Sequence, residues 1–133
     1  MAKLEMRDVS PGGHALSGAT VTGLPDRATL REILHRRVHA EVDAYNAEPG
    51  AVYVGLVQPE DAVRYSDGFR MRTPRPLDAN HLLTAAEEAV AAGVVVFHVG
   101  DDRVSDLDHE VDVAATAEIV TELRRPIVAR QPD

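Results

Sequence analysis

One segment of the sequence constrains the fold more than any other, and it runs from Thr29 to Tyr45. Its apolar residues recur at intervals of three, four and seven, which places them on one stripe of an α-helix. They are Leu30, Ile33, Leu34, Val38, Val42 and Tyr45. Thr29 and Glu32 have the spacing of a capping box, in which each side chain accepts a hydrogen bond from the backbone N–H group of the other residue. The segment therefore predicts a helix with one buried face, which other elements must cover.

Two strand-like segments precede this helix. Residues 4–9 alternate apolar and polar side chains with the period of a half-buried strand. The stretch from Ser10 to Gly13 supplies a proline and two glycines, which allow the chain to reverse. Residues 15–23 alternate again, so the two segments predict a β-hairpin.

Three further strands are expected toward the C-terminus. Residues 94–99 (VVVFHV) are β-branched or aromatic apart from one histidine, which is the composition of a strand covered on both faces. We expect this strand in the middle of the sheet. Residues 100–103 (GDDR) predict a tight turn, residues 105–113 (SDLDHEVDV) alternate as a strand, and residues 118–124 predict the last strand.

Residues 46–78 lack a regular pattern, and we expect them to form an irregular insertion with little core of its own. A β-like run at 51–57 leads into residues 59–68 (PEDAVRYSDG), which predict a polar turn or a short helix. Pro74 and Pro76 then exclude a helix and a central strand, because proline lacks the backbone N–H group.

A second helix follows the insertion. Asp78 is placed to cap its N-terminus and Gly93 to end it. Its buried stripe is formed by Leu82, Leu83, Ala86 and Val90. Strands and helices that follow one another in this order predict an α+β domain.

Composition excludes several kinds of protein. Fourteen basic and twenty-two acidic residues give a net charge of −8, which opposes binding to the phosphates of nucleic acids. The absence of cysteine excludes disulfides and thiolate chemistry. No apolar run reaches the roughly 20 residues that cross a bilayer, and the first residues do not resemble a signal peptide. We expect a cytoplasmic protein that binds neither nucleic acid nor membranes and uses no cofactor.

The order of elements resembles the β-grasp fold of ubiquitin and of the bacterial sulfur-carrier proteins. Residues 24–34 (LPDRATLREIL) are similar to the strand-to-helix junction of the molybdopterin-synthase small subunit and of the thiamine-pathway sulfur carrier. Residues 95–129 follow the later plan of those families, with a strand, a turn, an acidic stretch and a final strand. The resemblance covers about residues 1–45 and 79–129.

This resemblance implies one β-grasp domain over residues 1–133, in which a mixed sheet wraps one main helix. Residues 46–78 would be an insertion and residues 127–133 a short tail. The sulfur carriers end in Gly-Gly, whose carboxylate is activated by an enzyme, whereas Ala129 and Arg130 stand here. We therefore expect a non-catalytic, ubiquitin-like module that binds proteins through acidic and sheet surfaces. One alternative is a modifier or sulfur carrier activated at its C-terminus, with Ala129 and Arg130 as the tail site.

Four carboxylates are the first candidate binding site. If residues 105–113 form one strand, alternate side chains share a face. Those side chains belong to Asp106, Asp108, Glu110 and Asp112. Such a face predicts a protein partner with a basic surface, because complementary charges steer association.

Two weaker candidates remain. A small-ligand or enzymatic site around residues 51–75 is the second alternative function, and its side chains would be Tyr53, Tyr65, Arg70 and Arg72. His35 and His39 lie four residues apart and share a helix face, but a zinc site needs three or four ligands. We expect no metal site and no catalytic residue.

Overall fold

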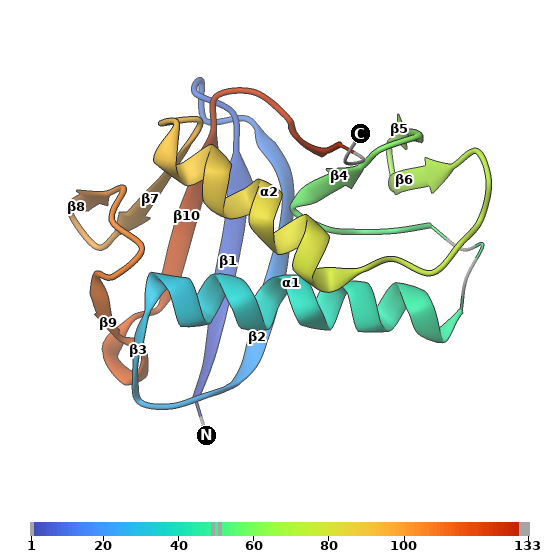
Figure 1. Cartoon of the computed structure of the whole chain (residues 1–133). Coiled ribbons are helices and arrows are strands. Elements are labelled where there is room, and N and C mark those ends of the chain that lie inside the picture. The colour runs from blue at the N-terminus through green and yellow to red at the C-terminus, as the bar shows by residue number, and fades with distance from the viewer. Residues whose placement is uncertain (1, 49, 51, 131–133) are drawn as a thin grey trace.

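The structure, a computed structural model, describes residues 2–48, 50 and 52–130. A five-stranded mixed sheet forms one layer, and two helices cross one of its faces (Figure 1). In spatial order the strands are β2 (Ala15–Leu24), β1 (Ala2–Val9), β10 (Glu118–Leu123), β7 (Val95–Val99) and β8 (Asp102–Val104). The β1–β10 pair is parallel and the other neighbours are antiparallel. The α+β class expected from the sequence is confirmed.

Helix α1 (Leu30–Ala47) forms as predicted, and its first turn carries the complete capping box. The backbone N–H of Glu32 donates to Thr29 Oγ1 at 3.2 Å, and the backbone N–H of Thr29 donates to Glu32 Oε1 at 3.2 Å. All six residues of the predicted apolar stripe are buried. Helix α1 therefore gains most of its stability from packing against the sheet.

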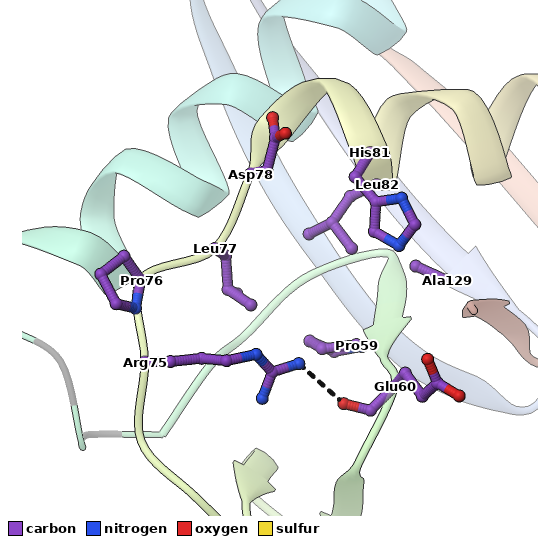
Figure 2. A pocket seen from close by; sticks show the side chains of 9 residues that line it. All are labelled: Pro59, Glu60, Arg75, Pro76, Leu77, Asp78, His81, Leu82 and Ala129. Atoms are coloured by element: carbon purple, nitrogen blue, oxygen red, sulfur yellow. Dashed lines mark hydrogen bonds between the residues drawn. The ribbon is translucent and has the colours of Figure 1, made fainter. Parts of the chain in front are cut away.

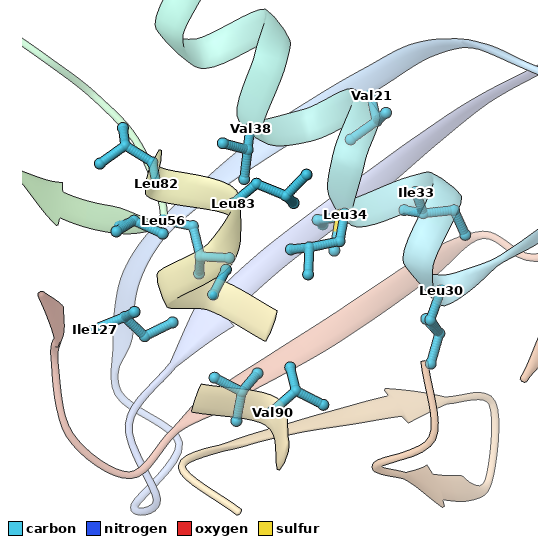
Figure 3. Packing of buried hydrophobic residues seen from close by; sticks show 14 of the residues in the cluster. Val21, Leu30, Ile33, Leu34, Val38, Leu56, Leu82, Leu83, Val90 and Ile127 are labelled. Atoms are coloured by element: carbon cyan, nitrogen blue, oxygen red, sulfur yellow. The ribbon is translucent and has the colours of Figure 1, made fainter. Parts of the chain in front are cut away.

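Helix α2 (Ala79–Ala91) packs beside α1 on the same face of the sheet. The side chain of Asp78 caps it by accepting from the backbone N–H of Asn80 at 3.0 Å. Beyond its end Gly93 has a φ of 77°, a left-handed conformation that glycine adopts without a steric penalty. Leu34 and Val38 of α1 meet Leu82 and Leu83 of α2 in the core that Figure 3 shows.

The central strand of the sheet is β10, and β7 lies between it and β8. Our expectation that residues 94–99 form the middle strand was therefore wrong by one position. Val95, Val96 and Phe97 are nevertheless all buried. A composition rich in β-branched residues indicates burial on both faces, and a strand next to the central one meets that condition as well.

Residues 105–113 do not form one strand. Only Glu110–Asp112 are extended, as β9, and they pair with β3 (Arg27–Thr29) outside the main sheet. Residues 107–108 form a turn. The turn expected at 100–103 is shorter than predicted, because Asp102 and Arg103 already belong to β8.

The insertion contributes residues to the main core, and it is more regular than we expected. It contains β4 (Val57–Pro59) and a hairpin of β5 (Ala62–Tyr65) and β6 (Gly68–Met71), where we expected a polar turn or a short helix. Its core residues are Tyr53, Leu56, Val57, Phe69, Met71 and Leu77. Phe69 and Met71 alternate along β6, but the other four do not repeat with the period of a helix or a strand.

Part of the expected tail is also ordered into a strand. Residues Ile127–Ala129 form β11, which pairs in parallel with β4. Ile127 and Ala129 are buried, so the segment closes the core along α2. Residues 131–133 of the expected tail lie outside the described part of the chain. Within residues 2–48, 50 and 52–130, no helix combines the length and apolar composition that a membrane span requires.

Candidate functional site

The acidic residues predicted from the sequence lie on an exposed ribbon, and arginines neutralise part of it. The ribbon consists of Asp106, Asp108, Glu110 and Asp112. Arg31 Nε lies 3.3 Å from Asp108 Oδ1, and Arg27 lies 3.2 Å from Glu110 and 3.9 Å from Asp112. Asp106 accepts from the backbone N–H of Asp108 at 2.9 Å. The carboxylates therefore do not form the single free row that we expected, because the chain turns at residues 107–108.

Of the four residues expected to gather in the insertion, the structure brings together only Arg70 and Tyr65. Tyr53 is fully buried, whereas Tyr65 is exposed on the hairpin. The Arg70 guanidinium lies 5.2 Å from the Tyr65 ring centroid and pairs with Asp67 at 3.1 Å. Arg72 lies 3.9 Å from Asp61. These two arginines form exposed ion pairs at the hairpin, whereas Tyr53 lies in the core.

The two remaining sequence candidates are not assembled sites either. The rings of His35 and His39 lie 4.2 Å apart, but the described residues contain no group of three or more side chains that could hold a metal ion. Ala129 is buried in β11 and Arg130 is exposed. Of the two residues of the expected tail site, Ala129 is therefore held in the fold and Arg130 is exposed to solvent.

A buried ionic cluster, which sequence reasoning missed, joins β1 to α1. Arg37 donates two parallel hydrogen bonds to Asp8, at 2.8 Å and 2.6 Å. Its Nε donates to Glu41 Oε2 at 3.2 Å. The side chains of Arg37 and Asp8 are 0% and 1% exposed, and that of Glu41 is 9% exposed. We call Asp8, Arg37 and Glu41 the core triad.

Two periods in the sequence place the core triad inside the protein. Arg37 follows Leu34 by three positions and Glu41 follows Val38 by three, so both fall on the apolar stripe of α1. Asp8 shares a face of β1 with Leu4 and Met6, which are both buried. Charged residues at buried positions of two elements were the signal that could have identified this cluster.

The core triad also fixes the insertion and borders two unusual hydroxyl groups. Glu41 Oε1 accepts from the backbone N–H of Leu56 at 3.2 Å. Among the described residues, the buried hydroxyls of Tyr53 and Thr121 have no hydrogen-bond partner. Thr121 lies opposite Asp8 in the β1–β10 pair. A polar region thus extends through the core, bounded by apolar side chains.

Burial and mutual charge control ionisation in this region. Burial alone would lower the pKa of Arg37, but its hydrogen bond to Asp8 and the charges of Glu41 and Asp8 outweigh this and raise it. Burial raises the pKa of Glu41 although Arg37 and the Leu56 N–H oppose the change. Burial and the charge of Glu41 raise the pKa of the Tyr53 hydroxyl. Arg37 is therefore permanently charged, and Tyr53 stays neutral.

A surface cleft of about 260 Å³ lies where β4, β11 and the start of α2 meet. Figure 2 shows that Arg75 spans it and donates to the Glu60 carbonyl, at 3.0 Å. Asp78 on its rim is the cap of α2. The other ionisable side chains that line it are Glu60 and His81. Two of its polar groups thus hold the chain in place, and the rest of the lining includes Pro59, Pro76, Leu77 and Leu82.

No protein-family model matches this chain, and comparison with curated proteins and with solved structures gives no match. The site must therefore be interpreted from its own geometry.

Proposed function

We propose that this protein is a β-grasp module that binds other proteins and performs no catalysis of its own. The strand order supports the β-grasp assignment: the first and last strands of the sheet are parallel neighbours at its centre, with the hairpin partner β2 on one side and β7 and β8 on the other. The main helix α1 follows the hairpin after only the short strand β3, which resembles the hairpin-then-helix order of the families that the sequence resembles.

The observation that carries a binding function is the location of the perturbed ionisable groups. An active site holds such groups where a substrate can reach them. Here they are Arg37, Glu41 and Tyr53, all are in the core, and the two charged ones are paired. Their hydrogen bonds explain how α1, β1 and the insertion are joined, which favours the surface as the part that meets a partner.

The surface offers three features to a partner. The first is the second face of the sheet, because both helices lie on the other face (Figure 1). The acidic ribbon has four carboxylates and only two arginines paired with them, so it remains negatively charged and would suit a partner with a basic surface. The third feature is the free edge of β2.

The alternative of a carrier activated at its C-terminus is less well supported. Threading a tail into an activating enzyme requires residues around Ala129 to leave the domain. Ala129 is 1% exposed, and β11 holds it against β4. Extending this segment would expose Ile127 and open the core beside α2.

Site-specific photocrosslinking in the native cells tests the proposal. A benzophenone amino acid is placed singly at Leu16 on the β2 edge, at His98 on the open sheet face and at Asp108 on the acidic ribbon. Thr84, exposed on α2, serves as the control position. A protein adduct of constant mass at one of the three test positions, and none at Thr84, supports a binding module. If no protein adduct formed at any of the three test positions, the proposal would be refuted.

A further inference from the structure

The two edges of the main sheet differ in a way that favours binding at one of them. Edge strands of soluble proteins are usually short, charged or interrupted, because their free backbone groups can pair with another chain. Strand β8 follows this rule, since it has three residues and two are charged. Strand β2 has ten residues (ALSGATVTGL) and no charged residue or proline. Among the described residues, β2 forms backbone pairs with β1 alone.

An arginine stands at each end of this uncharged edge. Arg36 of α1 donates to the Gly23 carbonyl at 3.0 Å. At the other end, Arg64 of β5 and Leu16 line one small hollow. Neither guanidinium has a carboxylate within salt-bridge distance among the described residues, although the protein has a net charge of −8. Gly23 and Leu16 are seven residues apart, which is about 23 Å along a strand.

The Leu16 end also carries an apolar patch. Leu16 is 41% exposed, Val54 is 50% exposed and Tyr65 is 51% exposed, and all three line the hollow with Arg64. Three of the five large apolar residues that are exposed in the described part of the chain thus meet at one end of β2. Clustered exposed apolar side chains of this kind mark contact sites.

We propose that the free edge of β2 binds an extended segment of a partner protein, which adds a sixth strand to the sheet. The segment has an uncharged middle, an acidic residue near each end at a spacing of about seven, and an apolar side chain beside the acid that meets Arg64. The backbone of Gly18–Thr22 supplies the pairing, and Arg36 and Arg64 select the acidic ends. This inference rests on the proposed function and names the surface and the partner class.

A second copy of this chain does not meet these requirements. Antiparallel pairing of two β2 edges would bring Arg36 of one copy toward Arg64 of the other. Parallel pairing would place each arginine beside its own equivalent. Both arrangements oppose like charges, whereas an acidic segment neutralises them.

A nuclear magnetic resonance titration of the ¹⁵N-labelled protein tests the inference. The probe is the synthetic peptide Glu-Phe-Thr-Val-Thr-Val-Thr-Glu, and the control peptide has lysine in place of both glutamates. We expect saturable shifts of the Gly18–Thr22 amides with the acidic peptide and no saturation with the basic one. High salt should weaken the binding, because both ion pairs are exposed.

Charge reversal identifies the residues responsible. Arg36→Glu and Arg64→Glu should each weaken binding about five- to tenfold. Arg103→Glu, on the opposite edge strand β8, should change it less than about twofold. The same spectra report whether each variant is folded, and Arg64→Gln, with a smaller expected loss, replaces Arg64→Glu if that variant is not.

Three results would overturn the inference: equal binding of both peptides, shifts centred away from β2, or a β2-mediated dimer in sedimentation experiments. Crosslinks at His98 or Asp108 without any at Leu16 would also overturn it, while leaving the binding module intact. Absence of crosslinks at all three positions would refute the module itself.

Discussion

Replacing Arg37 by methionine tests whether the core triad is as buried as the structure indicates. Methionine keeps an unbranched apolar stem, although a shorter one, and removes the guanidinium with its charge and its donors. Asp8 would lose both of its short hydrogen bonds to Arg37, and Glu41 would lose its bond to Arg37 Nε. Two carboxylates would then remain at 1% and 9% exposure without a cation.

Breaking a buried ion pair by removing one partner costs about 3–5 kcal/mol, because the remaining charge is desolvated without compensation. We expect Arg37→Met to lower the free energy of unfolding by that amount, measured by urea unfolding followed by circular dichroism. The neighbouring Arg36→Met is the control and should cost less than about 1 kcal/mol, because Arg36 is exposed.

A second substitution separates charge from packing. Adding Asp8→Asn to Arg37→Met removes one of the stranded carboxylates, so the double variant should recover part of the lost stability. A cost of about 0–1 kcal/mol for Arg37→Met, which is typical of solvent-exposed ion pairs, would refute the reasoning. Lack of any recovery in the double variant would show that lost packing causes the effect.

Three further changes test separate parts of the structure. Burial raises the pKa of Glu41 above its ordinary value of 4.5, so the folded state holds this proton more tightly and stability falls as pH rises from about 4.5 through the folded pKa. Glu41→Gln should therefore match the wild type at about pH 4 and exceed it in urea midpoint at about pH 7. Gly55→Ala should cost about 1–3 kcal/mol in the same assay, because the new Cβ would clash with the Tyr53 hydroxyl. Thr29→Ala removes the cap of α1 and should cost about 1 kcal/mol, whereas no effect would show that the capping box is dispensable.

The sequence predicts the elements that have a clear period. The stripe from Leu30 to Tyr45, the opening hairpin and the Asp78 cap all appear in the structure, because local spacing determines which face of a helix or strand is apolar. The same reasoning failed at residues 105–113. The alternating charged residues there lie on the exposed side of a turn and of the short strand β9, which pairs with β3. Alternation alone does not show which strands pair.

The core residues of the insertion are hard to predict for a related physical reason. Its core residues, such as Tyr53 and Phe69, are anchored by one β-bridge and by contacts with residues far along the chain. Long-range contacts of this kind leave no periodic trace. The apolar stripe alone does not reveal the core triad, because Arg37 and Glu41 lie on that stripe as charged residues and their partner Asp8 is far away in the sequence.

The core triad and the β2 edge are connected through the insertion. Glu41 accepts from the backbone N–H of Leu56, two positions after Val54. Val54 lines the hollow that Leu16 and Arg64 share at the end of β2. The charged pair inside the protein thus holds in place the segment that completes one end of the proposed binding edge.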